Sequence, residues 1–129
     1  MGSSLTRPHV LVDLGDCDPD RLDDEAGVRA LLLDVARNLA THVVGDIFHR
    51  FSPHGVTGVV AIEESHLSVH TWVESRYAAV DLFLCNSEVD AEQIDAEVQR
   101  MATFFGARRV AVKVVRRGAT HGGRKEPTA

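Results

Sequence analysis

The sequence predicts a single α+β domain, a two-layer sandwich in which two helices cover one face of a largely antiparallel sheet. Two segments repeat apolar residues at helical spacing, and six shorter segments have the composition of strands, in the order β-α-β-β-β-β-α-β. A chain of 129 residues has room for one core. With 44% hydrophobic and only 5% aromatic residues, that core must consist mainly of Val, Leu, Ile and Ala. Two helices on one face of such a sheet is the economical packing.

The first three elements follow from composition and spacing. Residues 9–15 alternate and are rich in Val and Leu, which predicts a first strand. Residues 16–24 are acidic and contain proline, which indicates a loop, and Asp23 or Asp24 suits the N-cap of the next helix. One amphipathic helix is predicted to extend to about Val43, because apolar residues recur at helical spacing: Val28, Leu31, Leu32, Val35 and Leu39.

The sequence after the first predicted helix indicates mainly strands. The candidates are residues 45–51, 56–63, 67–73 and 77–84, with a turn at residues 52–55. A second helix is expected to begin near Ser87 or Asp90, and Gly106 suits the C′ position that ends it. Its buried face would carry Ile94, Val98, Met101 and Phe105. Residues 109–115 form the last predicted strand, and residues 118–129 are expected to be a polar, mobile tail.

Composition and charge argue against several classes of function. The net charge is −5 and the pI is near 5.7, with no Lys/Arg stripe, so a nucleic-acid partner is not expected. No apolar run approaches the roughly 18 residues that a membrane span needs, and the N-terminus lacks a signal-peptide core. We therefore expect a cytoplasmic protein without a membrane partner. Cys17 and Cys85 are the only cysteines and form no CxxC motif, which favours free thiols.

An unusual mixture of side chains follows one predicted strand. Within residues 66–73, one face would carry His66, Ser68, His70 and Trp72, and the other would carry Leu67, Val69, Thr71 and Val73. In the next strand, Asp81, Phe83 and Cys85 alternate with Val80, Leu82 and Leu84. Two adjacent strands therefore offer one apolar face for the helices and one polar-aromatic face. The second face would be bare in a single chain, which suggests that a partner protomer covers it.

The residues alone leave several interpretations of this face open. A Ser-His-acid hydrolase is conceivable, but the chain lacks a Gly-x-Ser-x-Gly elbow. A metal site made of His66, His70 and Cys85 is conceivable, but the spacing matches no known zinc signature. Polar residues that merely contact water are a third interpretation.

The sequence of residues 63–74, Glu-Glu-Ser-His-Leu-Ser-Val-His-Thr-Trp-Val-Glu, resembles the processing-site motif of the small prokaryotic S-adenosylmethionine decarboxylase proenzymes. The similarity extends through residues 48–51, 55–58 and 77–85, and covers roughly residues 9–116 in the right order. It implies a pyruvoyl-dependent carboxy-lyase of spermidine biosynthesis that needs no metal. It also implies a small-molecule substrate and a homodimer of cleaved protomers.

The resemblance further implies that the chain cuts itself between Glu64 and Ser65. In this family an N-to-O acyl shift converts the peptide bond to an ester, and β-elimination then releases the upstream chain. The products here would be residues 1–64 and residues 65–129, which stay associated, with a pyruvoyl group derived from Ser65. That group would bind the substrate amine as a Schiff base and act as an electron sink.

Other family roles carry over residue by residue. His70 matches the base that removes the serine α-proton, and imidazole suits proton transfer near neutral pH. Thr57 stands where the family usually has a serine that assists this step. Cys85 matches the proton donor of the decarboxylation. Cys17 matches a family cysteine with no assigned role.

The substrate is implied by three further positions. Phe51 would stack on adenine, Trp72 would shape the nucleoside pocket, and Glu74 would accept hydrogen bonds from the ribose. These residues favour S-adenosylmethionine over arginine or ornithine, which some members of the family decarboxylate instead. Val73 departs from the family's usual proline, which relaxes the backbone before Glu74.

An unprocessed regulatory paralogue is the remaining alternative. Such a chain would be expected to have lost part of the processing machinery. Ser65, His70 and Cys85 are all present, and position 57 retains a hydroxyl, which argues against this alternative.

Overall fold

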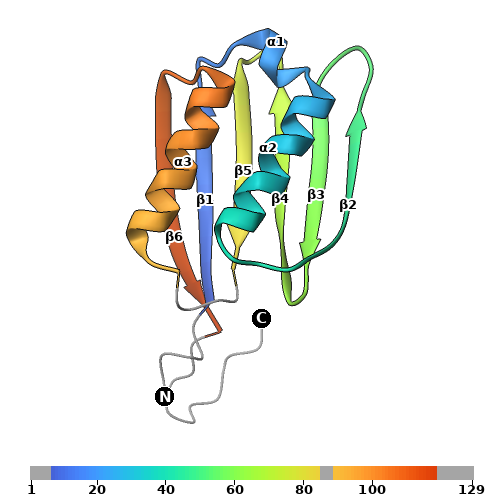
Figure 1. Ribbon diagram of the computed structural model, residues 1–129. Coiled ribbons are helices and arrows are strands. Elements are labelled where there is room, and N and C mark those ends of the chain that lie inside the picture. Colours follow the sequence, from blue (N-terminus) through green and yellow to red (C-terminus); the bar gives the residue numbers. More distant parts are fainter. Residues whose placement is uncertain (1–6, 85–88, 119–129) are drawn as a thin grey trace, which may run out of the picture.

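Six strands form one antiparallel sheet, and two long helices cover one of its faces (Figure 1). The computed structural model describes residues 7–84 and 89–118. The strands lie in the order β2-β3-β4-β5-β1-β6, and every neighbouring pair is antiparallel. The predicted α+β sandwich is confirmed. The strands are β1 (Arg7–Gly15), β2 (Val43–Arg50), β3 (Val56–Ile62), β4 (Ser65–Trp72), β5 (Tyr77–Phe83) and β6 (Arg109–Arg117).

The two long helices begin and end at residues that suit their positions. Helix α2 (Glu25–Asn38) has Asp24 as its N-cap, and the Asp24 side chain accepts a hydrogen bond from the Gly27 N–H at 2.9 Å. Helix α3 (Ala91–Phe105) begins with a capping box between Asp90 and Gln93. It ends at Gly106, whose φ of 65° lies in the left-handed region that glycine adopts without strain. The predictions for Asp24, Asp90 and Gly106 are confirmed.

Two predictions about helices were wrong. The acidic loop contains a short helix, α1 (Pro19–Leu22), because Asp18 caps it and Pro19 occupies its first turn. Helix α2 ends at Asn38 rather than near Val43. Ala40 has a φ of 60°, and the Thr41 hydroxyl donates to the Ala36 carbonyl at 2.8 Å, so the chain turns away from the helix before Val43.

Strand boundaries also differ from the predictions by a few residues. Strand β4 begins at Ser65, two residues earlier than predicted, because residues 63 and 64 form a two-residue turn between β3 and β4. Strand β2 begins at Val43 rather than at residue 45, and β6 extends to Arg117. The predicted tail lies outside the described residues from residue 119 onward.

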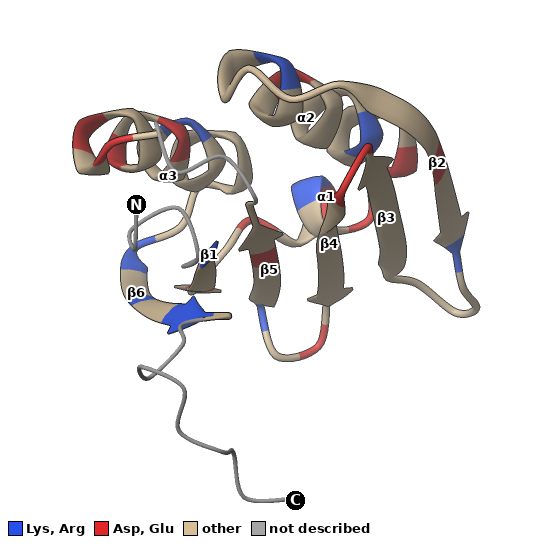
Figure 2. Ribbon diagram, turned by 90° about the horizontal axis from the view of Figure 1, so that it is seen from below, with Lys and Arg blue, Asp and Glu red and all other residues tan. Residues whose placement is uncertain are grey.

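Alternation along the strands separates a buried face from an open one. Helices α2 and α3 lie on the same side of the strands in Figure 2, and no helix in the described part of the chain lies on the other side. We call that other side the open face. The core lies between sheet and helices and includes Val12, Leu67, Val80, Leu32 and Phe105, all at most 1% exposed. The open face carries the polar and aromatic side chains that the alternation predicted.

Candidate active site

Ser65 is the first residue of β4, directly after the turn that joins β3 to β4. Its hydroxyl oxygen is buried and has no hydrogen-bond partner among the described residues. Buried hydroxyls are nearly always hydrogen bonded, so this group calls for an explanation. A hydroxyl held next to the Glu64 carbonyl and kept free of other partners is available for chemistry at that peptide bond.

A small cavity of about 200 Å³ lies against Ser65. It is lined by Arg7, Glu64, Ser65, Phe83 and Leu84. Sites for whole drug-sized ligands are larger, about 300–1,000 Å³, so this cavity suits a group of a few atoms. The Arg117 guanidinium lies 4.5 Å from the centroid of the ring of Phe83, one of the residues that line this cavity. Cys85 follows Leu84 in the sequence but lies outside the described residues, and its predicted role stays a prediction.

Thr57 and His70 face each other from adjacent strands β3 and β4. The Thr57 Oγ1 lies 3.2 Å from the His70 Nδ1, within hydrogen-bond distance. Both side chains lie on the open face, where the His70 side chain is exposed. The structure thus brings together a hydroxyl and an imidazole, the pair that the resemblance assigns to proton removal.

Trp72 lies beside His70 at the end of β4. The two ring centroids are 6.1 Å apart, and Trp72 is 42% exposed. An aromatic ring half in contact with water at the end of a polar face is an available stacking surface for a planar ligand.

Phe51 and Glu74 lie in the two turns next to Trp72. The Phe51 ring packs on Gly55, where a Cβ would approach the ring to 2.5 Å, so only glycine allows this contact. The Glu74 Oε1 lies 4.0 Å from the Nδ1 of His54. Asp23 stabilises the turn that contains Phe51, because its carboxylate accepts hydrogen bonds from the Arg50 guanidinium and from the Gly55 N–H.

The predicted site residues therefore form two groups at opposite ends of β4. We call them the hairpin end (Glu64 and Ser65 with their cavity) and the turn end (Phe51, Thr57, His70, Trp72 and Glu74). Ser65 and His70 are five residues apart, which is about 16 Å at about 3.3 Å per residue. An odd separation also directs the two side chains to opposite faces. Within one chain, the His70 imidazole cannot reach the Ser65 α-carbon.

Comparison with known proteins identifies the family. The family model of S-adenosylmethionine decarboxylase matches residues 8–118. The chain belongs to the S-adenosylmethionine decarboxylase family. An S-adenosylmethionine decarboxylase proenzyme of Methanococcus maripaludis is 36% identical over 110 residues, which cover 85% of this chain and 88% of that protein. One from Parasynechococcus marenigrum is 47% identical over 85 residues, 66% of each chain.

A solved structure has the same fold. The adenosylmethionine decarboxylase from Aquifex aeolicus superposes with a TM-score of 0.77 and 30% sequence identity, over 95% of this chain and 98% of that chain. The family predicted from the Glu-Ser-His-Leu motif is confirmed, and with it the expectation of a decarboxylase.

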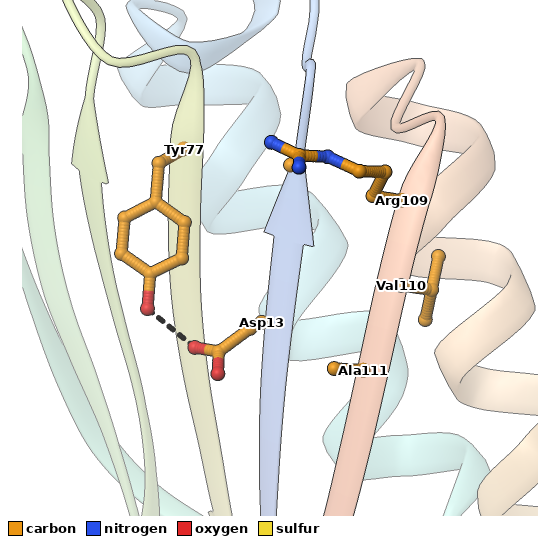
Figure 3. Close-up of a pocket in the computed structure, with 6 residues that line it drawn as sticks. Asp13, Tyr77, Arg109, Val110 and Ala111 are labelled. Carbon is orange, nitrogen blue, oxygen red and sulfur yellow. Dashed lines mark hydrogen bonds between the residues drawn. The ribbon is translucent and has the colours of Figure 1, made fainter.

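Sequence reasoning missed three residues near the two ends of this decarboxylase-family site. Arg7 lines the Ser65 cavity. The Tyr77 hydroxyl donates a hydrogen bond to Asp13 (Figure 3). The Tyr77 ring stacks on Trp72 with centroids 5.3 Å apart. Alternation from Asp81 back along β5 places Tyr77 on the open face, but the contact with Asp13 requires that β1 pairs with β5, which the sequence does not reveal.

Cys17 is buried in the core and belongs to neither the hairpin end nor the turn end. Its thiol donates to the Leu14 carbonyl at 3.4 Å. Burial, followed by the charge of Asp16, raises the pKa of the Cys17 thiol to about 11. Such a thiol stays protonated and unreactive near neutral pH, in keeping with its lack of an assigned role.

Two further features are absent from the described part of the chain. None of its clusters joins three His, Cys, Asp or Glu side chains in a way that could hold a metal ion. None of its helices is long and apolar enough to cross a membrane.

Proposed function

We propose that this protein is a self-processing, pyruvoyl-dependent decarboxylase that converts S-adenosylmethionine to its decarboxylated form for spermidine synthesis. The observation that carries the proposal is the buried hydroxyl of Ser65, directly after the turn, which has no hydrogen-bond partner among the described residues. Relatives are named proenzymes, which supports a chain that must be cut before it acts.

The proposed cleavage uses atoms that lie next to each other in the covalent chain. The Ser65 hydroxyl adds to the Glu64 carbonyl carbon, the peptide C–N bond breaks, and an ester forms while the Ser65 nitrogen becomes an amine. A base removes the Ser65 α-proton, and the ester leaves as the carboxylate of Glu64. Water then hydrolyses the remaining enamine, releasing ammonia and leaving a ketone at the new N-terminus.

Sheet topology supports lasting association of the two fragments. A cut before Ser65 leaves β1, β2 and β3 on the upstream fragment, and β4, β5 and β6 on the downstream fragment. Strand β1 lies between β5 and β6, and β3 pairs with β4, so three strand interfaces join the fragments. The fragments would therefore interleave within one sheet.

The proposed prosthetic group would lie in the cavity at the hairpin end, with Phe83, Leu84 and Arg7 around it. A pyruvoyl ketone there supplies the electron sink for loss of carbon dioxide. Phe83 and Leu84 would limit access of water to this cavity. Cys85 remains our proposed proton donor.

A homodimer would complete the site. In a pair whose two-fold axis crosses β4 midway, the hairpin end of each copy lies opposite the turn end of the other. The open face offers the surface for this pairing, because no described helix covers it and Trp72 is exposed there. Each site would then bring Thr57 and His70 of the second copy to the Ser65 α-carbon of the first, which lies in the strand backbone between the two faces.

The turn end supports S-adenosylmethionine rather than arginine or ornithine. A nucleoside has a flat ring and a vicinal diol, and Phe51, Trp72 and Glu74 offer two aromatic rings and a carboxylate. A short diamino acid offers neither feature. Arginine or ornithine would instead pair its cationic tail with Glu74.

Cleavage is tested by electrophoresis and mass spectrometry of the purified protein. We expect two fragments, and a downstream chain that begins with a pyruvoyl group in place of Ser65. Ser65→Ala should remain a single chain of 14.1 kDa. Ser68→Ala, the same change three residues along β4, should be cleaved as the wild type is. An active wild-type protein that stays intact would disprove the proposal. An intact chain that binds a processed relative and raises its activity would favour the regulatory paralogue.

The shared site is tested by mixing two inactive variants. Ser65→Ala and His70→Ala should each remain intact when produced alone. When they are produced together, the His70→Ala chain should be cleaved, because it keeps Ser65 and receives His70 from the other copy. Native mass spectrometry should confirm that mixed dimers form. Mixed dimers without cleavage would show that His70 does not act across the dimer.

The substrate is tested by release of carbon dioxide from S-adenosylmethionine, arginine and ornithine. Phe51→Ala should weaken binding of S-adenosylmethionine by about 1–3 kcal/mol, the range for a base–aromatic stack. Turnover of arginine or ornithine alone would reverse our substrate assignment and make Val73 the first residue to exchange.

A further inference from the structure

A row of side chains in contact crosses the open face from β3 to β1. Thr57 contacts His70, the His70 ring lies 6.1 Å from Trp72, and Trp72 stacks on Tyr77 with 5.3 Å between centroids and 20° between planes. The Tyr77 hydroxyl then donates to the Asp13 carboxylate (Figure 3). The proposed function assigns roles to Thr57, His70 and Trp72. It assigns no role to Tyr77 and Asp13.

Tyr77 and Asp13 border a cavity of about 290 Å³ at the β1–β6 side of the row. Gly15, Arg109, Val110 and Ala111 complete its lining. Register places Tyr77 directly opposite Trp72, and Asp13 opposite Ala79, two residues further along β5. The phenol therefore spans from the indole on one side to the carboxylate on the other.

We propose that Tyr77 and Asp13 are positioning residues that fix the Trp72 indole for the nucleoside of the substrate. This inference rests on the proposed function, because it takes Trp72 as part of the nucleoside pocket. Tyr77 stacks on the indole, and 42% of Trp72 remains exposed and accessible to a ligand. Asp13 in turn fixes the orientation of the Tyr77 ring through its hydroxyl.

Two features of Trp72 explain why such support matters. Trp72 is the last residue of β4 and is 42% exposed, so the core does not hold its ring in place. Offset stacking of two aromatic rings favours one mutual orientation. An indole held in its binding orientation loses less conformational entropy when a ligand binds, which improves affinity.

The hydrogen bond between Tyr77 and Asp13 also joins the two proposed fragments. Asp13 belongs to the upstream fragment with Phe51, whereas Trp72 and Tyr77 belong to the downstream fragment. Through this contact, the upstream fragment, which carries Phe51, helps to hold the Trp72 indole in place. The hydrogen bond to Asp13, followed by burial and the charges of Asp13 and Asp81, raises the pKa of Tyr77 to about 12, so the phenol keeps its donor proton near neutral pH.

The chain allows a direct optical test, because Trp72 is its only tryptophan and Tyr77 its only tyrosine. We would compare Tyr77→Phe, Tyr77→Leu, Asp13→Asn and Asp13→Ala. Asp34→Asn is the matched control, since Asp34 pairs with Arg37 on the exposed side of α2, far from the open face. Each protein is measured for self-cleavage, KM, kcat and tryptophan anisotropy, and the variants that keep Tyr77 are also measured for phenol ionisation.

We expect cleavage and kcat to stay near wild type while KM rises. Tyr77→Leu should raise KM about three- to ten-fold, the range for loss of an aromatic pair. Tyr77→Phe and Asp13→Ala should raise it about three-fold, because the stack remains without its hydrogen bond. Asp13→Asn retains an acceptor and should lie closest to wild type. Trp72 anisotropy should fall in the same order as KM rises.

Phenol ionisation gives an independent measure of the contact. Asp13→Asn should lower the pKa of Tyr77 from about 12 toward its ordinary value of 10.0. Asp34→Asn should leave it unchanged.

Unchanged KM and unchanged Trp72 anisotropy in Tyr77→Phe and Asp13→Ala would overturn the inference. A fall in kcat or in cleavage with constant KM would also overturn it, since a positioning role acts on binding. Failure of the proposed function is recognised separately, as a wild-type protein that releases no carbon dioxide from S-adenosylmethionine. In that case Trp72 anisotropy still decides whether Tyr77 and Asp13 fix the indole.

Discussion

Thr71 and Ser65 carry hydroxyl groups on the same face of the same strand, and their surroundings are opposite. The Thr71 hydroxyl is fully buried, donates to the Leu22 carbonyl at 2.7 Å and accepts from the Val56 N–H at 2.9 Å. The Ser65 hydroxyl is buried and has no partner among the described residues. Thr71 thereby joins α1, β3 and β4 at the turn end, whereas the Ser65 hydroxyl bonds to no other described residue at the hairpin end.

The difference separates a structural hydroxyl from a reactive one. Each partner of Thr71 lowers the free energy of the folded chain and also occupies the oxygen. Burial of a hydroxyl without a partner instead costs about 1–3 kcal/mol in mutational data. Ser65 thus stays available for its neighbouring carbonyl at the expense of stability, in line with the cleavage that we propose.

The largest expected effect on stability is at Thr71. Thr71→Val keeps the shape of the side chain but leaves the Val56 N–H and the Leu22 carbonyl unpaired in the core. We expect a loss of about 2–4 kcal/mol in the free energy of unfolding, because each unpaired group costs about 1–3 kcal/mol. Denaturant titration measures it. Thr71→Ser keeps the hydroxyl and should cost about 1 kcal/mol, the value for a deleted methyl group. Equal losses in the two variants would refute the role of the hydrogen bonds.

A second, smaller effect concerns acid stability at the turn end. Hydrogen bonds from Arg50, and then from the Gly55 N–H, hold the pKa of Asp23 below its ordinary value of 3.8. A lowered folded-state pKa contributes stability that is complete above the ordinary value and is lost as pH falls through the lowered one. Asp23→Asn should therefore reduce Tm at neutral pH and flatten its fall between about pH 5 and about pH 2. Arg50→Gln should reproduce much of this change. If Tm fell with decreasing pH in both variants just as it does in the wild type, the stabilising role of the Asp23 carboxylate would be contradicted.

The smallest effect on stability is expected at Ser65 itself. Ser65→Ala removes a buried hydroxyl that has no described partner, so the free energy of unfolding should rise by about 1 kcal/mol, the lower end of the cost of burying such a group. The reference should be His70→Ala, which we also expect to remain a continuous chain. A loss above about 1 kcal/mol would show that the Ser65 hydroxyl does have a stabilising partner.

Local patterns in the sequence predict most of the fold. Alternation located the strands, and Asp24, Asp90 and Gly106 marked helix ends, because caps depend on residues a few positions apart. The predicted end of α2 was wrong because apolar residues continue past Asn38. The left-handed φ of Ala40 and the contact of Thr41 with the Ala36 carbonyl end the helix there.

The site was harder to predict because its geometry depends on pairing between distant strands. The motif places Ser65 and His70 close in sequence, but an extended strand separates them by about 16 Å, at about 3.3 Å per residue. The contact between Asp13 and Tyr77 depends on β1 lying beside β5, which no local pattern specifies. Residues on one strand could be assigned to a face, but their partners across the sheet could not.

The position of β1 between β5 and β6 has a kinetic consequence. Before a cut at Ser65, the sheet forms by a first-order reaction within one chain. After it, the sheet could re-form only by collision of two separate polypeptides, each lacking the neighbours its strands need, so renaturation would depend on concentration. Cleavage would thus turn a reversible fold into one whose persistence is governed by its unfolding rate. Folding would therefore have to precede cleavage. If the chain were cut before β1 entered the sheet, the two fragments would have to meet by diffusion.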